Sequence, residues 1–516
     1  MSEFVNAVDA FGVRNPDVCA FRNSRGESIT YGELKAYSDS LAAWVSGIDA
    51  TREPLVVYGH KTPFMLVAFL ACVKSGHAYV PIDTNLPKSR AIDILGQLGK
   101  PLMLNTLDEG IPDFDDFVSL QIDLNELRRQ AQAASRADLA AVAGDECFYI
   151  MFTSGSTGAP KGVEITASCL DNFWKWMVAE FPQPQPQPPA QPQVFFDRAP
   201  FSFDLSLTDI ALGLGTGNTM FSLESEDEAD LARSFDALEK ANPHFWVSTA
   251  SFADMCLRDP RFSSRLLPRV KTFFFVGETL KNETAGALLE RFRGCEVVNG
   301  YGPTESTDLV TSVRITPQMV ASVEPLPVGK ARPGTDLVIL DPDTMQLQPT
   351  GQAGELFIIG DTVAKGYFRR PDLTEAAFCS CPAHLCQGRR SYRTGDSATL
   401  DTEGMLHFHG RLDFQIKLHG YRIELGDIES NLRRLDLVAD ACVLPVWRKG
   451  AITHMAAYVV LAEGAAGQAF DLAQQIKAGL RGLVPEYMVP RKVVCIGAFP
   501  LNTNGKIDRD RLRGMG

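Results

Sequence analysis

Short apolar runs alternate with amphipathic stretches along the first part of the chain. Residues 54–60, PLVVYGH, predict a buried strand, and residues 62–76, TPFMLVAFLACVKSG, predict a helix. Pro63 falls in the first turn of that helix and Gly76 at its end, the positions that these residues favour. The run AYVPID at 78–83 predicts a return to strand. Strands that alternate with helices of this length indicate an α/β fold, with β-sheets flanked by helices.

The pattern changes near residue 410, where a compact final stretch of about 100 residues begins. This stretch is long enough to form a small α+β domain with its own core. We therefore predict two domains, 1–411 and 412–516. The second domain contains the runs ACVLPVW (441–447) and MAAYVVL (455–461), with a helix predicted at 471–484 and a strand predicted around 491–497.

One insert interrupts the alternation. Residues 182–193, PQPQPQPPAQPQ, have a composition that favours extended polyproline conformation and cannot build a core. No apolar or charged pattern marks the insert as a docking motif, so we interpret it as a surface loop. The role of the insert stays open.

The bulk composition is that of a globular protein, with 45% hydrophobic and 22% charged residues. The net charge of -13 argues against nucleic acid or an anionic membrane surface as the main partner. The start of the chain lacks the pattern of a signal peptide, and the apolar run at 64–73 is too short to span a membrane. We therefore expect a cytoplasmic protein.

Eleven cysteines are scattered along the chain, which favours reduced thiols used in packing. Cys379, Cys381, His384 and Cys386 form the one local cluster, CSCPAHLC. Zinc sites prefer Cys pairs held well apart in sequence, so we favour a cysteine-rich surface loop over a metal site.

Residues 152–162, FTSGSTGAPKG, predict a phosphate-binding loop of an unusual kind. Apolar runs on both sides predict that the loop joins one strand to another, without the helix N-terminus that a Walker-type loop places behind the phosphate. Backbone N–H groups, hydroxyls and Lys161 would hold the anion, while Gly155 and Gly158 allow the backbone to approach it closely. A flexible linker is the alternative, although a lysine after the Ala-Pro step is unusual in a linker.

Four further motifs follow this loop in order: GYGPTEST (300–307), YRTGD (392–396), GRLDFQIKLHGYRIELGDIE (410–429) and NTNGKID (502–508). Together with the loop they resemble the core motifs of the adenylate-forming superfamily, and the resemblance covers nearly the whole chain. Within that superfamily, the segments SFDLSLTDI, VSTASFADMCL and FFFVGETL are most similar to the D-alanine–carrier-protein ligases.

The resemblance implies a two-step reaction that depends on ATP and Mg²⁺. A substrate carboxylate attacks the α-phosphorus of ATP, which gives an acyl-adenylate and pyrophosphate. The phosphopantetheine thiol of a carrier protein then captures the acyl group. Because the nucleophile of the first step is already an anion, the site needs charge neutralisation and alignment rather than a Ser-His-Asp triad.

The same resemblance assigns the nucleotide contacts to matching positions. Tyr301 would stack on adenine, Thr304 would touch the α-phosphate, and Glu305 would bind Mg²⁺. Asp396 would accept hydrogen bonds from the ribose hydroxyls, with Arg411 nearby as a donor. The remaining nucleotide-binding positions are Asn299 and, at the outer phosphates, Thr153, Ser154, Ser156, Thr157, Gly158 and Lys161.

A second set of positions is implied for the movement of the small domain. Lys506, in the NTNGKID motif, would reach the α-phosphate and the substrate carboxylate during adenylation. Asp413 matches the hinge position of the family. After the small domain turns, the stretch 415–422 would replace Lys506 for thioester formation.

Asp204 indicates that the substrate is an amino acid, because members that activate amino acids carry an aspartate here to pair with the ammonium group. D-Alanine is the first candidate; L-alanine, serine, glycine or a short diamino acid, as in nonribosomal peptide-type biosynthesis, remain open. Asp308 stands where D-alanine ligases usually have a small apolar residue, and it either faces solvent or contacts a hydroxyl or second amine of the substrate. The other predicted pocket residues are Leu205, Thr208, Ser248, Phe274, Val276, Gly300 and Leu309.

No carrier domain follows the lysine motif, so the thiol acceptor is expected to be a separate protein. The resemblance also implies a monomer. Two alternatives remain: an acid–CoA ligase, against which Asp204 argues, and a non-catalytic ATP-binding relative. Intact Lys161, Glu305, Asp396 and Lys506 argue against the second alternative.

Overall fold

The structure is a computed structural model, and it has two compact units. The first unit comprises Met1–Asp83, Leu98–Met151 and Gly162–Leu412; the second comprises Thr84–Gln97, Phe152–Lys161 and Asp413–Gly516. The sequence-based division into 1–411 and 412–516 assigns the two short segments to the large domain, and that division remains a prediction. The residues described are 1–108, 113–133, 139–155, 159–181, 192–228, 230–322, 324–448, 451–462, 465, 467–500 and 507–514.

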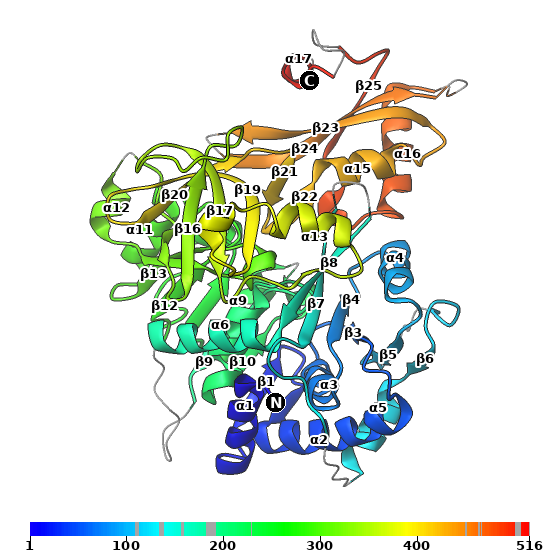
Figure 1. The fold of residues 1–516 in the computed structure, drawn as a ribbon, viewed down its shortest axis with the longest axis vertical. Coiled ribbons are helices and arrows are strands. Elements are labelled where there is room, and N and C mark those ends of the chain that lie inside the picture. The colour runs from blue at the N-terminus through cyan, green and yellow to red at the C-terminus, as the bar shows by residue number, and fades with distance from the viewer. Residues whose placement is uncertain are drawn as a thin grey trace. The chain divides into compact units, whose positions relative to one another are not determined.

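Two β-sheets form the framework of the first unit (Figure 1). The larger sheet has 13 strands, of which β10, β9, β11, β12 and β13 are neighbours in parallel pairing. The strands of the larger sheet, in spatial order, are β16 (Thr335–Leu340), β17 (Gly354–Gly360), β19 (Ser391–Leu400), β20 (Met405–Arg411), β15 (Gly329–Ala331), β14 (Thr311–Arg314), β13 (Glu296–Tyr301), β12 (Thr272–Phe275), β11 (Phe245–Ser248), β9 (Val194–Asp197), β10 (Thr219–Ser222), β1 (Cys19–Asn23) and β2 (Ser28–Thr30).

The smaller sheet has 7 strands, and its central strands are buried along their whole length. Its spatial order is β18 (Gly366–Tyr367), β8 (Lys161–Thr166), β7 (Cys147–Thr153), β4 (Tyr79–Asp83), β3 (Leu55–Gly59), β5 (Leu102–Asn105) and β6 (Leu120–Ile122). The predicted strands at 54–60 and 78–83, and the strand predicted directly before the loop at 152–162, are thereby confirmed as β3, β4 and β7.

Helices cover both sheets, which confirms the predicted α/β class. Their starts follow local chemistry: Thr30 and Glu33 form a capping box at the start of α2, and Pro63 stands in the first turn of α3. The helices of the first unit that bear on the site or the core are α1 (Glu3–Arg14), α2 (Tyr31–Ile48), α3 (Pro63–Lys74), α5 (Leu124–Gln132), α6 (Ala167–Glu180), α7 (Ser206–Leu212), α9 (Leu231–Ala241), α10 (Ala250–Leu257) and α11 (Asn282–Arg291).

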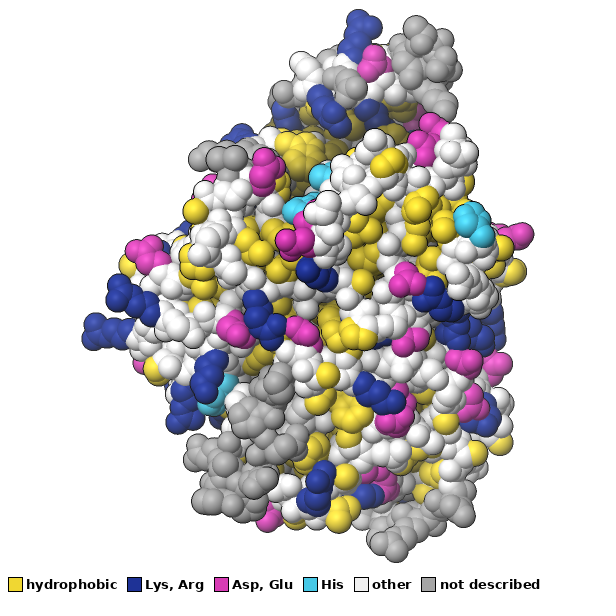
Figure 2. Space-filling view, turned by 60° about the vertical axis from the view of Figure 1, so that its left-hand side comes forward, with side chains coloured by type: hydrophobic (Ala, Val, Ile, Leu, Met, Phe, Trp, Pro, Cys, Tyr) yellow, Lys and Arg dark blue, Asp and Glu magenta, His cyan; other side chains and the backbone are white. Residues whose placement is uncertain are grey.

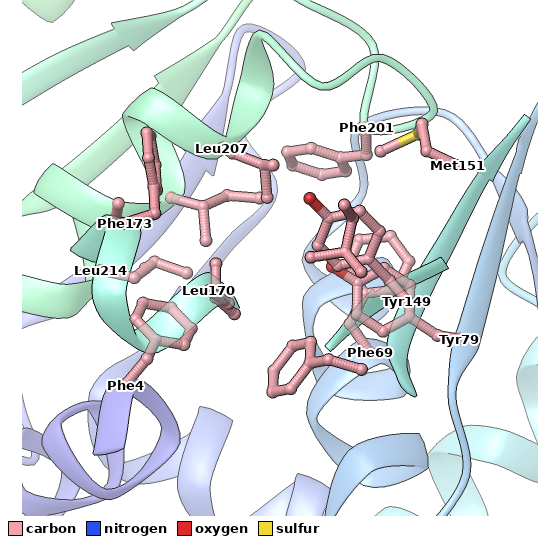
Figure 3. Packing of buried hydrophobic residues seen from close by; sticks show 14 of the residues in the cluster. Phe4, Phe69, Tyr79, Tyr149, Met151, Leu170, Phe173, Phe201, Leu207 and Leu214 are labelled. Atoms are coloured by element: carbon pink, nitrogen blue, oxygen red, sulfur yellow. The ribbon is translucent and has the colours of Figure 1, made fainter. Parts of the chain in front are cut away.

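The main core of the first unit joins these helices to residues of both sheets. Side chains of α3, α6 and α7 meet the aromatic rings of β4 and β7, and Figure 3 shows Phe69, Tyr79, Tyr149, Leu170 and Leu207 in this packing. A second core lies on the other face of β11 and β12, because successive side chains of a strand point to opposite faces. Helix α7, which follows Asp204, is therefore held by the main core.

No helix within the described residues combines the length and the apolar character needed to cross a bilayer. On the face shown in Figure 2, acidic and basic side chains are interspersed rather than segregated.

The C-terminal part of the second unit contains a hairpin of β21 (Gln415–Leu418) and β22 (Tyr421–Glu424) and a sheet of β23 (Val438–Arg448), β24 (Ala451–Leu461) and β25 (Lys492–Ile496). His419 and Gly420 have φ values of 54° and 83°, which suits the two-residue turn of the hairpin. The strand predicted around 491–497 and the helix predicted at 471–484 are confirmed as β25 and α16. The helices of this unit are α4 (Lys88–Leu98, which begins in it), α15 (Leu425–Leu432), α16 (Ala469–Arg481) and α17 (Arg509–Arg513).

A buried ion pair joins α4 to α15 within the second unit. The two terminal nitrogens of the Arg90 guanidinium contact the carboxylate of Asp427. Asn431 donates a hydrogen bond of 2.9 Å to the same carboxylate. Burial raises the pKa of Asp427 to about 6, although Arg90 acts to lower it. The folded state thus disfavours the ionised carboxylate, and its stability falls as the pH rises from the ordinary pKa near 3.8 toward 6.

We expect Arg90→Gln to weaken the second unit more at pH 8 than at pH 5. At pH 8 the variant would bury an unpaired carboxylate, at a loss of about 3 kcal/mol. At pH 5 that carboxyl group is mostly protonated, so the loss should be smaller. Hydrogen-exchange mass spectrometry of peptides from α4 and α15, corrected for intrinsic rates, measures the local opening free energy at each pH.

The control variant is Arg433→Gln, which breaks an exposed ion pair with Asp440 and should lose less than about 1 kcal/mol at either pH. Equal losses at pH 5 and pH 8 in Arg90→Gln would contradict the role given to this pair.

Candidate active site

Two aspartates and two threonines exchange hydrogen bonds across the first unit. Asp204 lies two residues before α7, and Thr208 lies in the first turn of that helix. Thr304 begins a 3-10 turn after β13, and Asp308 follows that turn. The Thr304 hydroxyl donates to the Asp204 carboxylate, and the Thr208 hydroxyl donates to the Asp308 carboxylate over 2.7 Å. We call these four residues the aspartate–threonine exchange.

The segment that carries Thr304 and Asp308 is held in an unusual backbone conformation. Thr307 and Asp308 both have positive φ, 61° and 65°, in the left-handed region that few non-glycine residues adopt. At Gly302 an added Cβ would lie 2.2 Å from the Asp308 carbonyl oxygen, so only glycine fits there. This turn directs the Asp308 side chain inward, where it is 3% exposed; the solvent-facing alternative for Asp308 is therefore wrong.

Four buried apolar residues among the predicted pocket positions form what we call the apolar wall. Phe274, Val276 and Leu309 are buried in the main core together with Leu205. A Cβ added to Gly300 would lie 2.6 Å from Cδ2 of Leu309, so the absence of a side chain there lets the wall close. The structure thus places Gly300 against Leu309 and Phe274, and the predicted pocket residues Leu205 and Val276 belong to the same core.

Ser248 does not join this group. Its hydroxyl accepts a hydrogen bond of 2.8 Å from the Trp246 indole and donates one to the Thr249 carbonyl. Ser248 pairs with Phe275 across the sheet, and Trp246 and Phe275 both belong to the second core. Phe274 and Val276 belong to the main core on the other face. The alternation of side chains along β11 explains why Ser248 lies apart from them.

Glu305 presents a buried carboxylate beside Thr304. The Tyr367 hydroxyl of β18 donates to its Oε1 over 2.6 Å, and its own carbonyl accepts from the Ala364 N–H. Glu305 is 0% exposed, so these contacts hold the group in one orientation. A single fixed carboxylate next to phosphate oxygens is the kind of ligand that Mg²⁺ uses, and Glu305 fits such a role.

Tyr301, Asp396 and Arg411 come together from β13, β19 and β20. Asp396 and Arg411 are cross-strand partners, and a guanidinium nitrogen of Arg411 donates to Asp396 Oδ1 over 2.8 Å. The Tyr301 hydroxyl donates to the other carboxylate oxygen. Burial, and then the nearby Asp396 charge, raises the pKa of Tyr301 well above its ordinary value, so the phenol remains a donor.

Asn299, also on β13, offers an acceptor to a ligand. Its Nδ2 donates to the Pro327 carbonyl over 2.8 Å, whereas its Oδ1 is buried without a hydrogen-bond partner among the described residues. Buried acceptors are normally satisfied, so an absent donor such as the adenine amino group would complete this one. The residues assigned to the nucleoside therefore fit that group.

The loop after β7 belongs to the second unit. A Cβ added to Gly155 would lie 2.1 Å from the Ala159 carbonyl oxygen, so the turn requires glycine. The buried hydroxyl of Thr153 finds no partner among the described residues, whereas the hydroxyl of Ser154 donates to the Arg422 carbonyl of β22. Lys161 begins β8 at half-buried depth. The predicted loop residues Ser156, Thr157 and Gly158 lie outside the described residues.

Lys506 also lies outside the described residues, so its predicted role remains a prediction. Asp413, the predicted hinge residue, begins the C-terminal part of the second unit and accepts a hydrogen bond from the Gln415 N–H. The Glu424 N–H donates to the Ser154 hydroxyl, so the hairpin lies against the start of the loop within that unit.

The cysteine cluster carries no sign of a metal site. Within the described part of the chain, no group of three or more His, Cys, Asp or Glu residues is arranged to hold a metal ion. Cys379, Cys381 and Cys386 form no disulfide, and His384 and Cys386 lie in the short helix α14 (Ala383–Cys386), so this part of the predicted loop is helical.

Two tyrosines of the candidate site were not predicted from the sequence. Tyr367, which fixes Glu305, is 62 residues away from it in sequence, and Tyr149 lies in β7 with its hydroxyl buried and unpaired among the described residues. Neither tyrosine belongs to the quoted motifs. The one signal for Tyr149 is a polar tip within an otherwise apolar strand, which favours a buried hydroxyl with a function or a hidden partner.

Comparison with known proteins adds relatives along nearly the whole chain. A model of the AMP-binding enzyme family matches residues 8–368, and the model of its C-terminal domain matches residues 427–506. D-Alanine--D-alanyl carrier protein ligases from Bacillus mycoides and Bacillus cereus are 40% identical over 511 residues, which is 99% of this chain and 99% of each relative.

Solved structures agree with this grouping. A holo nonribosomal peptide synthetase protein with adenylation and PCP domains, bound to a vinylsulfonamide inhibitor, superposes with a TM-score of 0.82 and 26% identity, over 99% of this chain and 84% of that one. An o-succinylbenzoate CoA synthetase from Bacillus subtilis has a TM-score of 0.82 at 20% identity, over 100% of this chain and 98% of that one, which shows a shared fold.

We expect Gly155→Ala to weaken binding of ATP at least about tenfold, a loss of about 1.4 kcal/mol, because the loop must open around the new methyl group. Binding of AMP should change little, since the loop is assigned to the outer phosphates. Isothermal titration calorimetry with each nucleotide measures both affinities. Gly96→Ala is the matched control, because an added Cβ there meets nothing within 4 Å. An unchanged affinity for ATP would refute the loop assignment.

Proposed function

Because the chain belongs to the AMP-binding enzyme family, we propose that it is a ligase that activates a small amino acid with ATP and transfers it to a carrier-protein thiol. The first step would give aminoacyl-AMP and pyrophosphate. The second would form a thioester on the phosphopantetheine arm of a separate carrier protein. The names of the similar ligases make D-alanine the first candidate substrate.

The observation that carries this proposal is the position of Asp204. Its carboxylate accepts a hydrogen bond from Thr304, which directly precedes Glu305, and Asp204 is followed in sequence by Leu205 of the apolar wall. A half-buried carboxylate of this kind favours a cation, and the α-ammonium of an amino acid would supply it. Thr304 would then align the carboxylate of the substrate with the α-phosphate of ATP, so that the two reacting groups are held together.

Each part of the nucleotide has matching residues. Asn299 would accept from adenine, and Asp396, fixed by Tyr301 and Arg411, would accept from the ribose. Mg²⁺, when bound, would neutralise phosphate charge, and Glu305 would hold it. The Mg²⁺ site is part of the proposal. Consumption of ATP and of a free thiol fits the cytoplasmic location expected from the sequence.

The second unit would serve the two half-reactions in turn. Lys506 would assist adenylation, and the hairpin of β21 and β22 would take its place for thioester formation after rotation at Asp413. The hydrogen bonds between Ser154 and β22 support an arrangement in which the hairpin rests on the loop. One loop would thus meet different parts of the small domain at different stages.

Amino-acid-dependent exchange of pyrophosphate into ATP tests the proposal. The wild type should support exchange with at least one small amino acid, and Asp204→Asn should lower kcat/KM for it by about 100-fold or more, because the ammonium loses its charged partner. Glu283→Gln, which removes an exposed acid from the start of α11, should leave exchange unchanged. Exchange that responds only to fatty or aromatic acids would refute the proposal.

An acid–CoA ligase is the second candidate, favoured by the shared fold of the CoA synthetase. Free coenzyme A and a holo carrier protein, offered as alternative acceptors after adenylation, separate the two functions. Faster transfer to coenzyme A would favour the second candidate.

A further inference from the structure

Asp308 adds a second acid to the candidate site that contains Asp204. The two carboxylates stand in a symmetrical relation, since each accepts from a threonine of the other's segment. Asp204 and Thr208 are four residues apart, as are Thr304 and Asp308. The Leu207 N–H bonds to the Asp204 carbonyl, so Asp204 and Thr208 follow one helical turn. Each segment therefore helps to hold the carboxylate of the other segment in position.

A buried tyrosine, Tyr149, lies near the carboxylates of both acids. The Tyr149 hydroxyl is buried and lacks a hydrogen-bond partner among the described residues. Burial raises the pKa of Tyr149, and after the neighbouring Tyr79 the charges of Asp204 and Asp308 raise it further, so both carboxylates lie near this phenol. In Figure 3 the Tyr149 ring lies with Tyr79, opposite Leu207 of α7 and below Phe201. A buried donor without a partner among the described residues calls for an acceptor from elsewhere, such as a ligand or a water molecule.

Asp308 is an acceptor of the kind that such a ligand needs. Its carboxylate accepts from the Thr208 hydroxyl, and a carboxylate can accept from more than one donor. Buried carboxylates favour donors, and above all cations, over a methyl group. Leu205, Phe274 and Val276, the apolar residues assigned to the same pocket, are buried in the main core, so a pocket that they line would take a short substrate.

A third buried acid, Asp209, differs from Asp308 in its surroundings. Asp209 follows Thr208 directly, and burial, with the charge of Asp197, raises its pKa well above the ordinary value, so the group favours its neutral form. Lys61 is buried beside it and donates to the Asp197 carbonyl over 3.0 Å. The Asp209 side chain thus belongs to a buried cluster with Asp197 and Lys61, although the charge of Asp308 also acts on it, whereas Asp308 accepts a hydrogen bond from Thr208.

We propose that the amino acid activated here carries a hydrogen-bond donor on a short side chain, a second amine or a hydroxyl, and that Asp308 accepts it. This inference rests on the proposed function and narrows its substrate class. Asp204 would bind the α-ammonium group and Asp308 the side-chain donor. The preference thereby moves from alanine toward 2,3-diaminopropionate or serine.

Four substrates of graded chemistry test the proposal: alanine, serine, 2,3-diaminopropionate and 2-aminobutyrate, each as both enantiomers. 2-Aminobutyrate has the same number of side-chain heavy atoms as the two donors but donates no hydrogen bond. The measurement is kcat/KM in pyrophosphate exchange. In the wild type, the better donor substrate should exceed 2-aminobutyrate by about 100-fold or more, because a site built for a donor rejects the analogue that lacks it.

Asp308→Asn is the informative variant, since asparagine tolerates the left-handed backbone found there. It should lower the donor-to-aminobutyrate ratio at least about tenfold, with diaminopropionate affected more than serine because the charge is lost. Asp209→Asn is the matched control, a neighbouring buried acid whose removal should leave the ratio unchanged. Retained exchange with alanine in Asp308→Asn would show that the variant is folded.

Two results would overturn the inference while leaving the proposed function intact. One is a wild type that activates alanine or 2-aminobutyrate as well as the donor substrates. The other is a ratio that Asp308→Asn leaves unchanged. Absence of exchange with every amino acid would instead refute the proposed function, and the inference with it.

Discussion

The exchange of hydrogen bonds between two aspartates and two threonines is the constraint on which the candidate site depends. It ties the start of α7 to the turn after β13, two segments 100 residues apart in sequence. Thr304 belongs to the exchange and directly precedes Glu305, so one turn carries both the threonine that contacts Asp204 and the carboxylate assigned to Mg²⁺. In the proposed function, amino acid recognition and phosphate chemistry would thus be coupled through that turn.

The fold supports this turn by close packing rather than by many polar contacts. Gly302 allows the backbone of Asp308 to approach, and Gly300 allows Leu309 to close the apolar wall. The main core holds α7 from behind, where Lys61 and Asp197 balance charge in a buried cluster. Any side chain added at these glycines would have to displace backbone or core atoms, which are densely packed.

Much of the framework could be predicted from the sequence. Strong apolar runs gave β3 and α3 their correct type, because burial on all sides leaves a pattern that does not depend on distant partners. The ordered motifs also indicated Asp204 and Glu305 as site residues. Distant pairings could not be predicted: the inward turn of Asp308 depends on Thr208 and on two positive φ values, and Tyr367 reaches Glu305 only through the smaller sheet. For Ser248, the register of β11 directs the side chain toward Trp246, and register is a tertiary property.

A crystal structure of the enzyme with its preferred amino acid and a non-hydrolysable ATP analogue tests most directly whether the two acids read the substrate together. We expect the α-ammonium group within hydrogen-bond distance of Asp204 and the side-chain donor within hydrogen-bond distance of Asp308, with both threonine contacts kept. An amino acid whose side chain points away from Asp308, or whose ammonium group binds elsewhere than Asp204, would contradict this arrangement.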